Sequence, residues 1–559
     1  PGASPTPLGS TAVGVTTANL SSLTPGTVYY FWVRTKGCSP DVSSWSTVGT
    51  FTTTNIPATY TWNGSSSTSW DTAANWTKSG GGTGIPTSID SVIITGTSVP
   101  NKLHIAANKT VTNFELTGSD ATSFSITGSN ALTITGIVAY TGTATAVLPC
   151  ASTVNITSTA NQIIPPLTYG NLNVLGGNRT FSPTGTIKIC SAFITNPALY
   201  SYTVTGSTVE YISSSTGWLM TPFNYNNLTF NGTGDFTLED GTINVAGNFV
   251  QSSGTVYLGD FGDPILNVTG NMTIGNGTIN TRSAFDSTIT VGGALNIITG
   301  GRLLSYSNYG TDTVTVAGNV LLSGTGSWDN FSDLGSTISI GGNLTLADNS
   351  EYFMLYDTVL TVGGNMILAN NGYFSAEDGG LGENSIITVN GDFSQSGTTI
   401  FYLNDKITSV LNVNGNMSLV GPSIFDLNFA TGGNATVNLK GNLSVDASST
   451  LRAGNTNNAT FNFNQTNGTV QNINVQSPVA AVDFVVGSQA SAKLLNNLQI
   501  TANTSLTVNG VFDADDKSLS GNGNNNQTLT VAATGTFKTA NPLGFSGGTA
   551  TAIVTSPAT

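Results

Sequence analysis

The chain has 559 residues, only 8% of which are charged, and 29 acidic against 15 basic residues give a net charge of −14. An acidic surface poor in Lys and Arg excludes nucleic acid and anionic membranes as favoured partners. No apolar run reaches the ~18 residues of a membrane-spanning helix. The apolar residues are mostly Val, Ile, Leu and Phe interleaved with Thr, Ser and Asn, which is typical of strands and turns.

The first 54 residues contain one clear strand pattern. Residues 23–38 read LTPGTVYYFWVRTKGC, with a Pro-Gly turn followed by side chains that alternate between two faces. The segment resembles the second half of a fibronectin type III domain, with Leu23 and Tyr29 at the positions of its leucine and corner tyrosine. A whole domain needs about 100 residues. Residues 1–54 are therefore expected to be its C-terminal part, in a protein that continues upstream and has its signal peptide there.

Residues 55–84 form a Trp-rich segment. Trp62, Trp70 and Trp76 lie in the stretch TWNGSSSTSWDTAANW. We interpret them as a cap that covers the exposed first coil of the repeat described next, because open strand edges promote aggregation. The alternative is that the Trp rings bind a sugar.

A repeat dominates the remainder of the chain. Segments such as INVAGNF, LTVGGNM and VNLKGNL recur with glycine spacings of 23, 23, 25, 24, 22, 27, 24 and 26 residues. A period near 24 without helical segments predicts a parallel β-solenoid with one coil per repeat. The central, corner glycines are Gly247, Gly270, Gly293, Gly318, Gly342, Gly364, Gly391, Gly415 and Gly441.

The columns of the repeat predict how each coil is built. Counted from the glycine, positions −4, −2 and +2 are apolar in every copy, which indicates two strands that meet at a corner. Gly is expected there because the corner requires a positive φ or a backbone free of side chains. A third strand carries Tyr257, Trp328, Tyr352 and Phe374 at position +10, which we predict to face the core while position +9, with Arg302 and Glu351, faces water. A sugar-binding stripe is the alternative for these aromatic residues.

Position +1 is Asn in seven of nine copies, with Ala294 and Asp392 as exceptions. Like residues of successive coils lie above one another, about 4.8 Å apart, so we predict a ladder of amide-to-amide hydrogen bonds. The alternative is that Asn only tolerates the turn. The ladder would comprise Asn248, Asn271, Asn319, Asn343, Asn365, Asn416 and Asn442.

The predicted fold class is therefore all-β: a parallel β-solenoid over residues 85–545, preceded by a partial fibronectin type III-like β-sandwich. The period predicts 18 or 19 coils. Residues 546–559 are expected to link to a further downstream region.

Catalytic, cofactor-binding and metal-binding residues are not predicted. The best acidic pair, Glu377 and Asp378, is adjacent in sequence, so on a strand the two would point to opposite faces. We interpret Asp513, Asp515 and Asp516 as a solvated turn rather than a calcium site. Cys38, Cys150 and Cys190 show no metal spacing; free thiols are favoured, although Cys150 and Cys190 could pair.

The TWNG…NW segment followed by these coils resembles the repeat-rich surface proteins of Bacteroidota. The resemblance implies export by the type IX secretion system, and a role as a non-enzymatic adhesin at the cell surface. Expected partners are a glycan or surface receptor and the secretion and anchoring machinery, without a cofactor. The family's C-terminal sorting domain is not found and is expected outside this sequence. The alternatives are a β-helix polysaccharide lyase or hydrolase, and a self-assembling filament subunit.

Bacteria of this group also attach O-glycans at Asp-Ser or Asp-Thr followed by a small or aliphatic residue. Five such tripeptides occur, and those within the repeat are expected in exposed loops that enter the first strand. An ordinary Asp turn is the alternative. The candidate sites are Thr72, Ser91, Ser287, Thr313 and Thr358.

Overall fold

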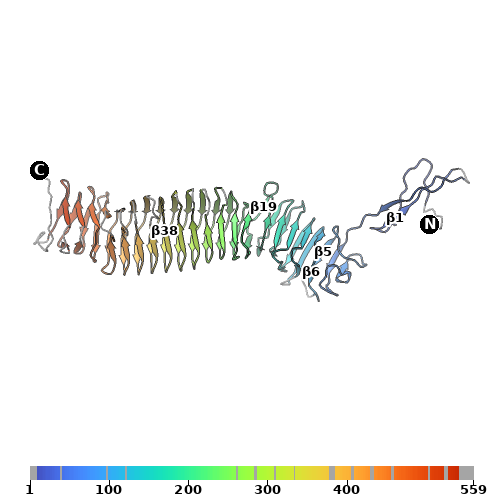
Figure 1. The fold of residues 1–559 in the computed structure, drawn as a ribbon, viewed down its shortest axis with the longest axis horizontal. Helices are drawn as coiled ribbons and strands as arrows, with labels where there is room; N and C mark the ends of the chain where they lie inside the picture. Colours follow the sequence, from blue (N-terminus) through green and yellow to red (C-terminus); the bar gives the residue numbers. More distant parts are fainter. Residues whose placement is uncertain are drawn as a thin grey trace.

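The computed structural model confirms the predicted all-β class and the parallel β-solenoid (Figure 1). Its one helix among the described residues is the short 3-10 helix η1 (Ala73–Asn75). The solenoid has about 18 turns, near the predicted number. The structure describes residues 9–540 except 38–40, 96–98, 120–122, 260–261, 282–285, 307–309, 333, 377–383, 404–407, 429–432, 455–458, 501–503 and 522–526.

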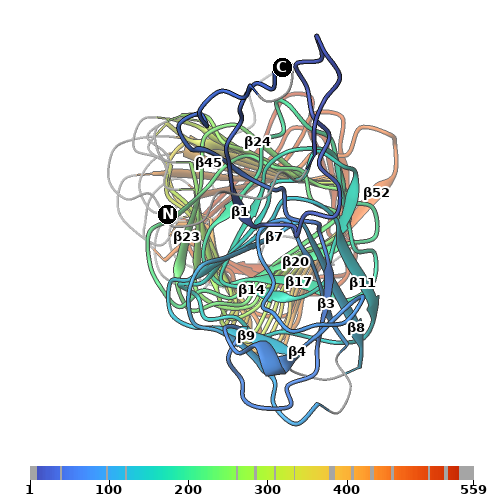
Figure 2. The ribbon, with the colours of Figure 1, turned by 90° about the vertical axis from the view of Figure 1, so that its right-hand side faces the viewer.

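Each central coil contains three short strands. In one of them, β36 (Ser336–Ile340) leads through the corner at Gly342 to β37 (Leu344–Leu346), and a turn leads on to β38 (Glu351–Met354). A loop then enters β39 (Thr358–Val362), which pairs in parallel with β36 one coil earlier. Repetition of this path stacks like strands on like strands, so that successive coils overlie one another in a view along the rod (Figure 2).

Three long parallel sheets result from this stacking. The first sheet has 13 strands, from β24 (Thr242–Val245) to β59 (Thr528–Val531). The second has 17, from β14 (Thr168–Tyr169) to β60 (Thr536–Lys538). The third has 11, from β21 (Trp218–Met220) to β50 (Thr450–Arg452).

Most strands before residue 200 belong to other, shorter sheets, although the 17-stranded sheet already begins at β14. One of these sheets has the strand order β11 (Val138–Gly142), β8 (Asn113–Gly118), β5 (Ser91–Ile94), β3 (Thr59–Trp62) and β4 (Trp76–Lys78). Another has the order β18 (Phe193–Ile194), β15 (Asn171–Val174), β12 (Thr153–Ile156), β10 (Ala131–Ile134) and β7 (Lys109–Val111). The second of these ends at β18 (Phe193–Ile194). Near β19 (Tyr202–Thr203) the blue-to-cyan coils are inclined to the straight remainder of the rod (Figure 1).

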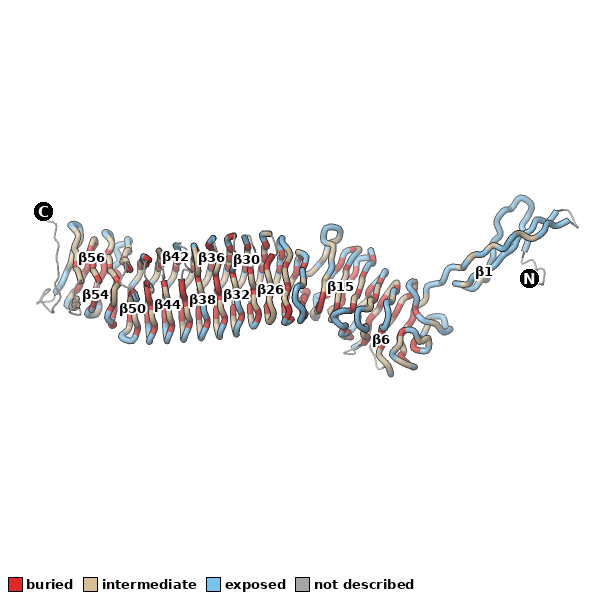
Figure 3. The backbone as a smooth tube through the Cα atoms, in the orientation of Figure 1, coloured by how far each residue is buried: buried red, intermediate tan, exposed pale blue. Residues whose placement is uncertain are grey.

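The N-terminal residues form a separate ribbon. Strands β1 (Val28–Phe31) and β2 (Gly49–Thr52) pair antiparallel, and most side chains around them are exposed (Figure 3). The Tyr29 hydroxyl accepts a hydrogen bond of 2.7 Å from the Thr24 backbone N–H. A β-sandwich is not confirmed within the described residues.

The core is a set of inward columns, one residue per coil. At the third strand Leu303, Trp328 and Tyr352 are fully buried, as predicted. The prediction is wrong for Tyr257 and for the two coils that begin this column. There Val256 and Ile279, at position +9, are buried and align with Leu303, because the strand is shifted by one residue relative to the corner glycine.

Candidate functional site

An open groove of about 510 Å³ lies on the outer face of the third sheet. It crosses β32 (Arg302–Ser305), β35 (Ser327–Asn330) and β38. The volume is within the range of ligand pockets, although the groove is wide open. Its lining residues are Arg302, Ser327, Asp329, Phe331, Glu351, Phe353 and Leu355.

Strand alternation directs these side chains to the outer face of the sheet. Trp328 and Tyr352 point inward and are fully buried, so the residues on either side of each point outward. Glu351 pairs in register with Ser327, and Phe353 pairs with Asp329. Residues about 24 positions apart in the sequence therefore form one continuous surface.

The groove combines an ion pair, a second carboxylate and aromatic rings. Arg302 Nε donates a hydrogen bond to Asp329 Oδ2, whose side chain is only 5% exposed. Burial raises the pKa of Asp329, and the nearby Arg302 guanidinium opposes that rise. Glu351 is exposed beside this pair. Charged donors and acceptors next to the Phe353 ring suit a ligand that has hydroxyl groups and apolar faces.

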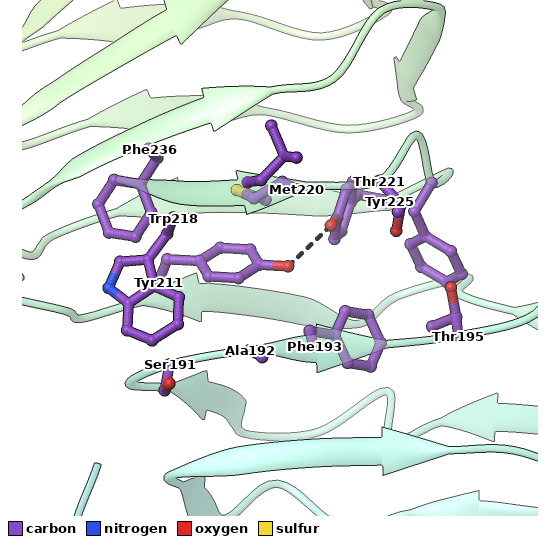
Figure 4. Close-up of a pocket in the computed structure, with 12 residues that line it drawn as sticks. Ser191, Ala192, Phe193, Thr195, Tyr211, Trp218, Met220, Thr221, Tyr225 and Phe236 are labelled. Carbon is purple, nitrogen blue, oxygen red and sulfur yellow. Dashed lines mark hydrogen bonds between the residues drawn. The ribbon is translucent and has the colours of Figure 1, made fainter. Parts of the chain in front are cut away.

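A second hollow lies inside the rod where the sheets change. Tyr211, Trp218, Tyr225 and Phe236 surround it, and a hydrogen bond of 2.9 Å joins the hydroxyls of Tyr211 and Tyr225 (Figure 4). Its volume of about 10 Å³ accommodates about one water molecule. The hollow is therefore a packing defect at the junction rather than a ligand pocket.

The three tryptophans lie together at the N-terminal end of the solenoid. All are buried, and the Trp76 ring lies 4.9 Å from the rings of both Trp62 and Trp70. Strand β3 (Thr59–Trp62) pairs in parallel with β5 (Ser91–Ile94), whereas β4 (Trp76–Lys78) closes the edge of the sheet in the antiparallel direction. The sheet thus begins before residue 85, and the buried rings present no open face to a sugar.

The corner glycines have a different physical role from the expected positive φ. None of the nine is among the residues with positive φ. A Cβ on Gly342 would lie 2.2 Å from Asn319 Oδ1 and 2.8 Å from Gly318 O. Glycine is required because successive coils approach closely at the corner, which was the second of the two reasons considered.

The Asn column also forms a ladder, but not the predicted one. Each side-chain oxygen accepts a hydrogen bond from the backbone N–H of the next coil: Asn248 from Asn271, Asn319 from Asn343, and Asn343 from Asn365. Asn365 Oδ1 binds the N–H of Asp392, and the series continues through Asn416 and Asn442. Ala294 carries no side-chain acceptor, so it interrupts the ladder.

Amide-to-amide bonds occur instead at position −3 on the first sheet. Asn267 Nδ2 donates to Asn244 Oδ1, Asn438 to Asn412, and Asn462 to Asn438, at distances of 2.9–3.0 Å. This column escaped the sequence analysis because Thr and Ser replace Asn in its central copies. The sequence did contain an indication of it. In the repeat, position −3, between the buried positions −4 and −2, holds only residues with a hydroxyl or amide group.

The expectation of exposed glycosylation sites is wrong for two of the five candidates. Ser287 and Thr358 are 1% and 0% exposed because each is the first residue of a strand, β30 (Ser287–Val291) and β39, and points inward. Thr358 Oγ1 donates to Leu355 O and accepts from Asn330 Nδ2. A glycan at either position would have to enter the core. Thr72, Ser91 and Thr313 are partly exposed.

Asp312 belongs to the same inward column. It is fully buried and pairs in register with Ser287 and Ser336. Hydroxyl groups of Ser287, Thr281 and Ser332 all donate to its carboxylate. Burial raises the pKa of Asp312, and these hydrogen bonds oppose the rise.

The remaining candidates from the sequence are the three cysteines and two groups of acidic residues. Cys150 and Cys190 form a disulfide, so the expectation of free thiols is wrong for this pair. Cys38, Glu377, Asp378 and residues 546–559 lie outside the described residues. Asp515 and Asp516 form ion pairs with Lys493 and Lys517. Among the described residues, no group of three His, Cys, Asp or Glu side chains is arranged to hold a metal.

No protein-family model matches this chain, and neither a curated protein nor a solved structure shows significant similarity to it. In the described part of the chain, no helix is long and apolar enough to cross a bilayer.

Proposed function

We propose that this protein is a non-enzymatic extracellular rod that attaches to surface glycans through the groove on its third sheet. The observation that carries the proposal is the arrangement of Arg302, Asp329 and Glu351 around Phe353 in an open groove. Hydroxyl groups of a sugar would bond to the charged groups, and an apolar ring face would lie against Phe353. The repeated coils would hold this site away from the surface to which the rod is anchored.

Two features support an extracellular location. The Cys150–Cys190 disulfide is of a kind that persists in oxidising compartments. The Tyr29–Thr24 hydrogen bond matches the corner that the fibronectin type III resemblance implies, and such modules are common in surface proteins. Together with the resemblance to Bacteroidota surface proteins, they support type IX export and the secretion and anchoring machinery as partners.

The test is a glycan-array screen of the whole chain with matched variants. Phe353→Ala and Glu351→Gln should each abolish binding to the glycan that the wild type selects, and should leave the melting curve little changed because both side chains lie on the outer face. Thr345→Ala, on the outer face of β37 in the second sheet, is the control and should bind as wild type. Equal binding by all four proteins would disprove the role of the groove.

One observation favours the enzymatic alternative, a polysaccharide hydrolase. Asp329 and Glu351 are two carboxyl groups in one groove, and the raised pKa of Asp329 is the direction that a general acid requires. The measurement is the release of reducing ends from neutral and uronic-acid polysaccharides. Turnover that is lost in Asp329→Asn and Glu351→Gln would replace the binding proposal with the enzymatic one.

A further inference from the structure

The outer face of the 13-stranded first sheet is a regular array of uncharged side chains. Each strand presents positions −5 and −3 to solvent, and the strands pair residue on residue from β24 to β59. Among the described residues of these two rows, Asp483 is the single charged side chain. Other charged groups of the same coils lie outside these rows, for example on the third sheet, as in the groove and the Arg452–Asp426 pair, or in corners and loops, as with Asp392 and Lys440.

Position −5 is β-branched in ten consecutive coils, and position −3 carries a hydroxyl or amide group in the same ten. Because β-branched side chains have few rotamers and the Asn side chains bond to one another, the face is stiff as well as regular. The residues at position −5 are Thr242, Ile265, Thr288, Thr313, Thr337, Val359, Ile386, Val410, Thr436 and Thr460; those at position −3 are Asn244, Asn267, Thr290, Thr315, Ser339, Thr361, Thr388, Asn412, Asn438 and Asn462.

We infer that this face binds a crystalline surface of water, that is, ice. The two rows repeat about every 4.8 Å along the rod and lie about 6.6 Å apart along each strand. The first spacing is close to the separation of second-neighbour oxygen atoms in hexagonal ice, whereas the second is somewhat shorter than the axial repeat of that lattice. Row −3 supplies a hydroxyl or amide group in each of these coils, and row −5 adds Thr hydroxyls except at its aliphatic members, such as Val359, Ile386 and Val410. The methyl groups between these polar groups take up little water.

The absence of charge on this face is the second part of the argument. A charged side chain holds its own hydration shell, and removing that shell is costly, so charges oppose contact with a lattice of neutral molecules. A face meant only for solubility would carry such charges. The whole chain carries few of them, and in the described part of these coils all except Asp483 lie outside the two rows.

The experiment measures thermal hysteresis and ice-crystal shape with the whole chain. The wild type should shape ice crystals and lower the freezing point below the melting point. Thr337→Lys, at an exposed position of the array, should lose most of this gap, and Thr361→Lys in the next coil should do the same. The control, Thr345→Lys on the second sheet, should retain it.

Circular-dichroism melting curves accompany each measurement, so that only folded variants are compared. A wild type that neither shapes ice nor separates the two temperatures overturns the inference. So does an equal loss in Thr345→Lys, because the effect would then not belong to the first sheet. Retention of binding to insoluble cellulose or chitin without any effect on ice would assign the face to a polysaccharide and also overturn it.

Discussion

The side-chain oxygen of Asn319 accepts a hydrogen bond of 2.9 Å from the backbone N–H of Asn343, one coil further along the rod. The bond occupies a backbone donor at the corner, where the chain turns from the first sheet to the second. The same relationship recurs from Asn343 to Asn365 and from Asn416 to Asn442. Removal of one such side chain therefore affects the coil that follows it.

The interruption at Ala294 leads to the first prediction. Ala294→Asn should supply the missing acceptor for the backbone N–H of Asn319 and raise the free energy of unfolding by about 1 kcal/mol. Asn343→Ala should lower it by about the same amount. Thermal or denaturant unfolding measures both, and a destabilised Ala294→Asn would show that the corner of that coil differs from the others.

The second prediction concerns the close approach at the corner. Gly342→Val should destabilise the protein by roughly 1–3 kcal/mol, because its Cβ would meet Asn319 Oδ1 and Gly318 O inside contact distance. Gly275→Ala is the control, since a Cβ there meets nothing closer than 3.5 Å and its φ is not positive. A melting curve of Gly342→Val that overlays the wild type would contradict the close-approach explanation.

The third prediction is a pH dependence caused by Asp312. Burial raises its pKa in the folded state, so the folded form holds the proton at a pH where the unfolded form has lost it. The Asp312 carboxyl group therefore destabilises the fold least at acid pH. Its destabilising effect grows as the pH rises from the unfolded pKa through the folded pKa. Asp312→Asn should raise the melting temperature at neutral pH and lose this advantage under acid conditions. An advantage that is constant with pH would point to packing instead of charge.

The fourth prediction concerns the buried tryptophans. Trp70→Ala should remove a fully packed ring and cost about 3–5 kcal/mol, with increased dye binding and aggregation as the first coil opens. Glycan binding by the fraction that stays folded should be unchanged, because the groove lies far along the chain. Trp32→Ala, at a site that is 42% exposed, is the control. If Trp70→Ala lost glycan binding without aggregating, the result would support the alternative that the tryptophans bind a sugar.

The repeat could be predicted because one glycine per coil is required by a contact between neighbouring coils, so Gly247 through Gly441 mark the period directly. The inward direction of Ser287 and Thr358 could not be predicted. The first strand of each coil begins before position −4, and its inward residues there are small and polar, which in the sequence is typical of a turn. The groove was missed for another reason. Arg302 and Glu351 were predicted to face water, but only the registers of β32 against β35 and of β35 against β38 bring them together with Asp329 and Phe353.

The direction of the interstrand hydrogen bonds has a mechanical consequence. In this fold the hydrogen bonds between neighbouring coils are parallel to the rod axis. Tension between the two ends of the rod therefore breaks the bonds of one coil at a time instead of shearing those of many coils together. A coil of about 24 residues that peels off shortens the rod by about 4.8 Å and releases some 80 Å of extended chain. The Cys150–Cys190 bond would hold back the loop between these two cysteines, which are 40 positions apart. Under load, such a rod would lengthen in discrete steps, one coil at a time.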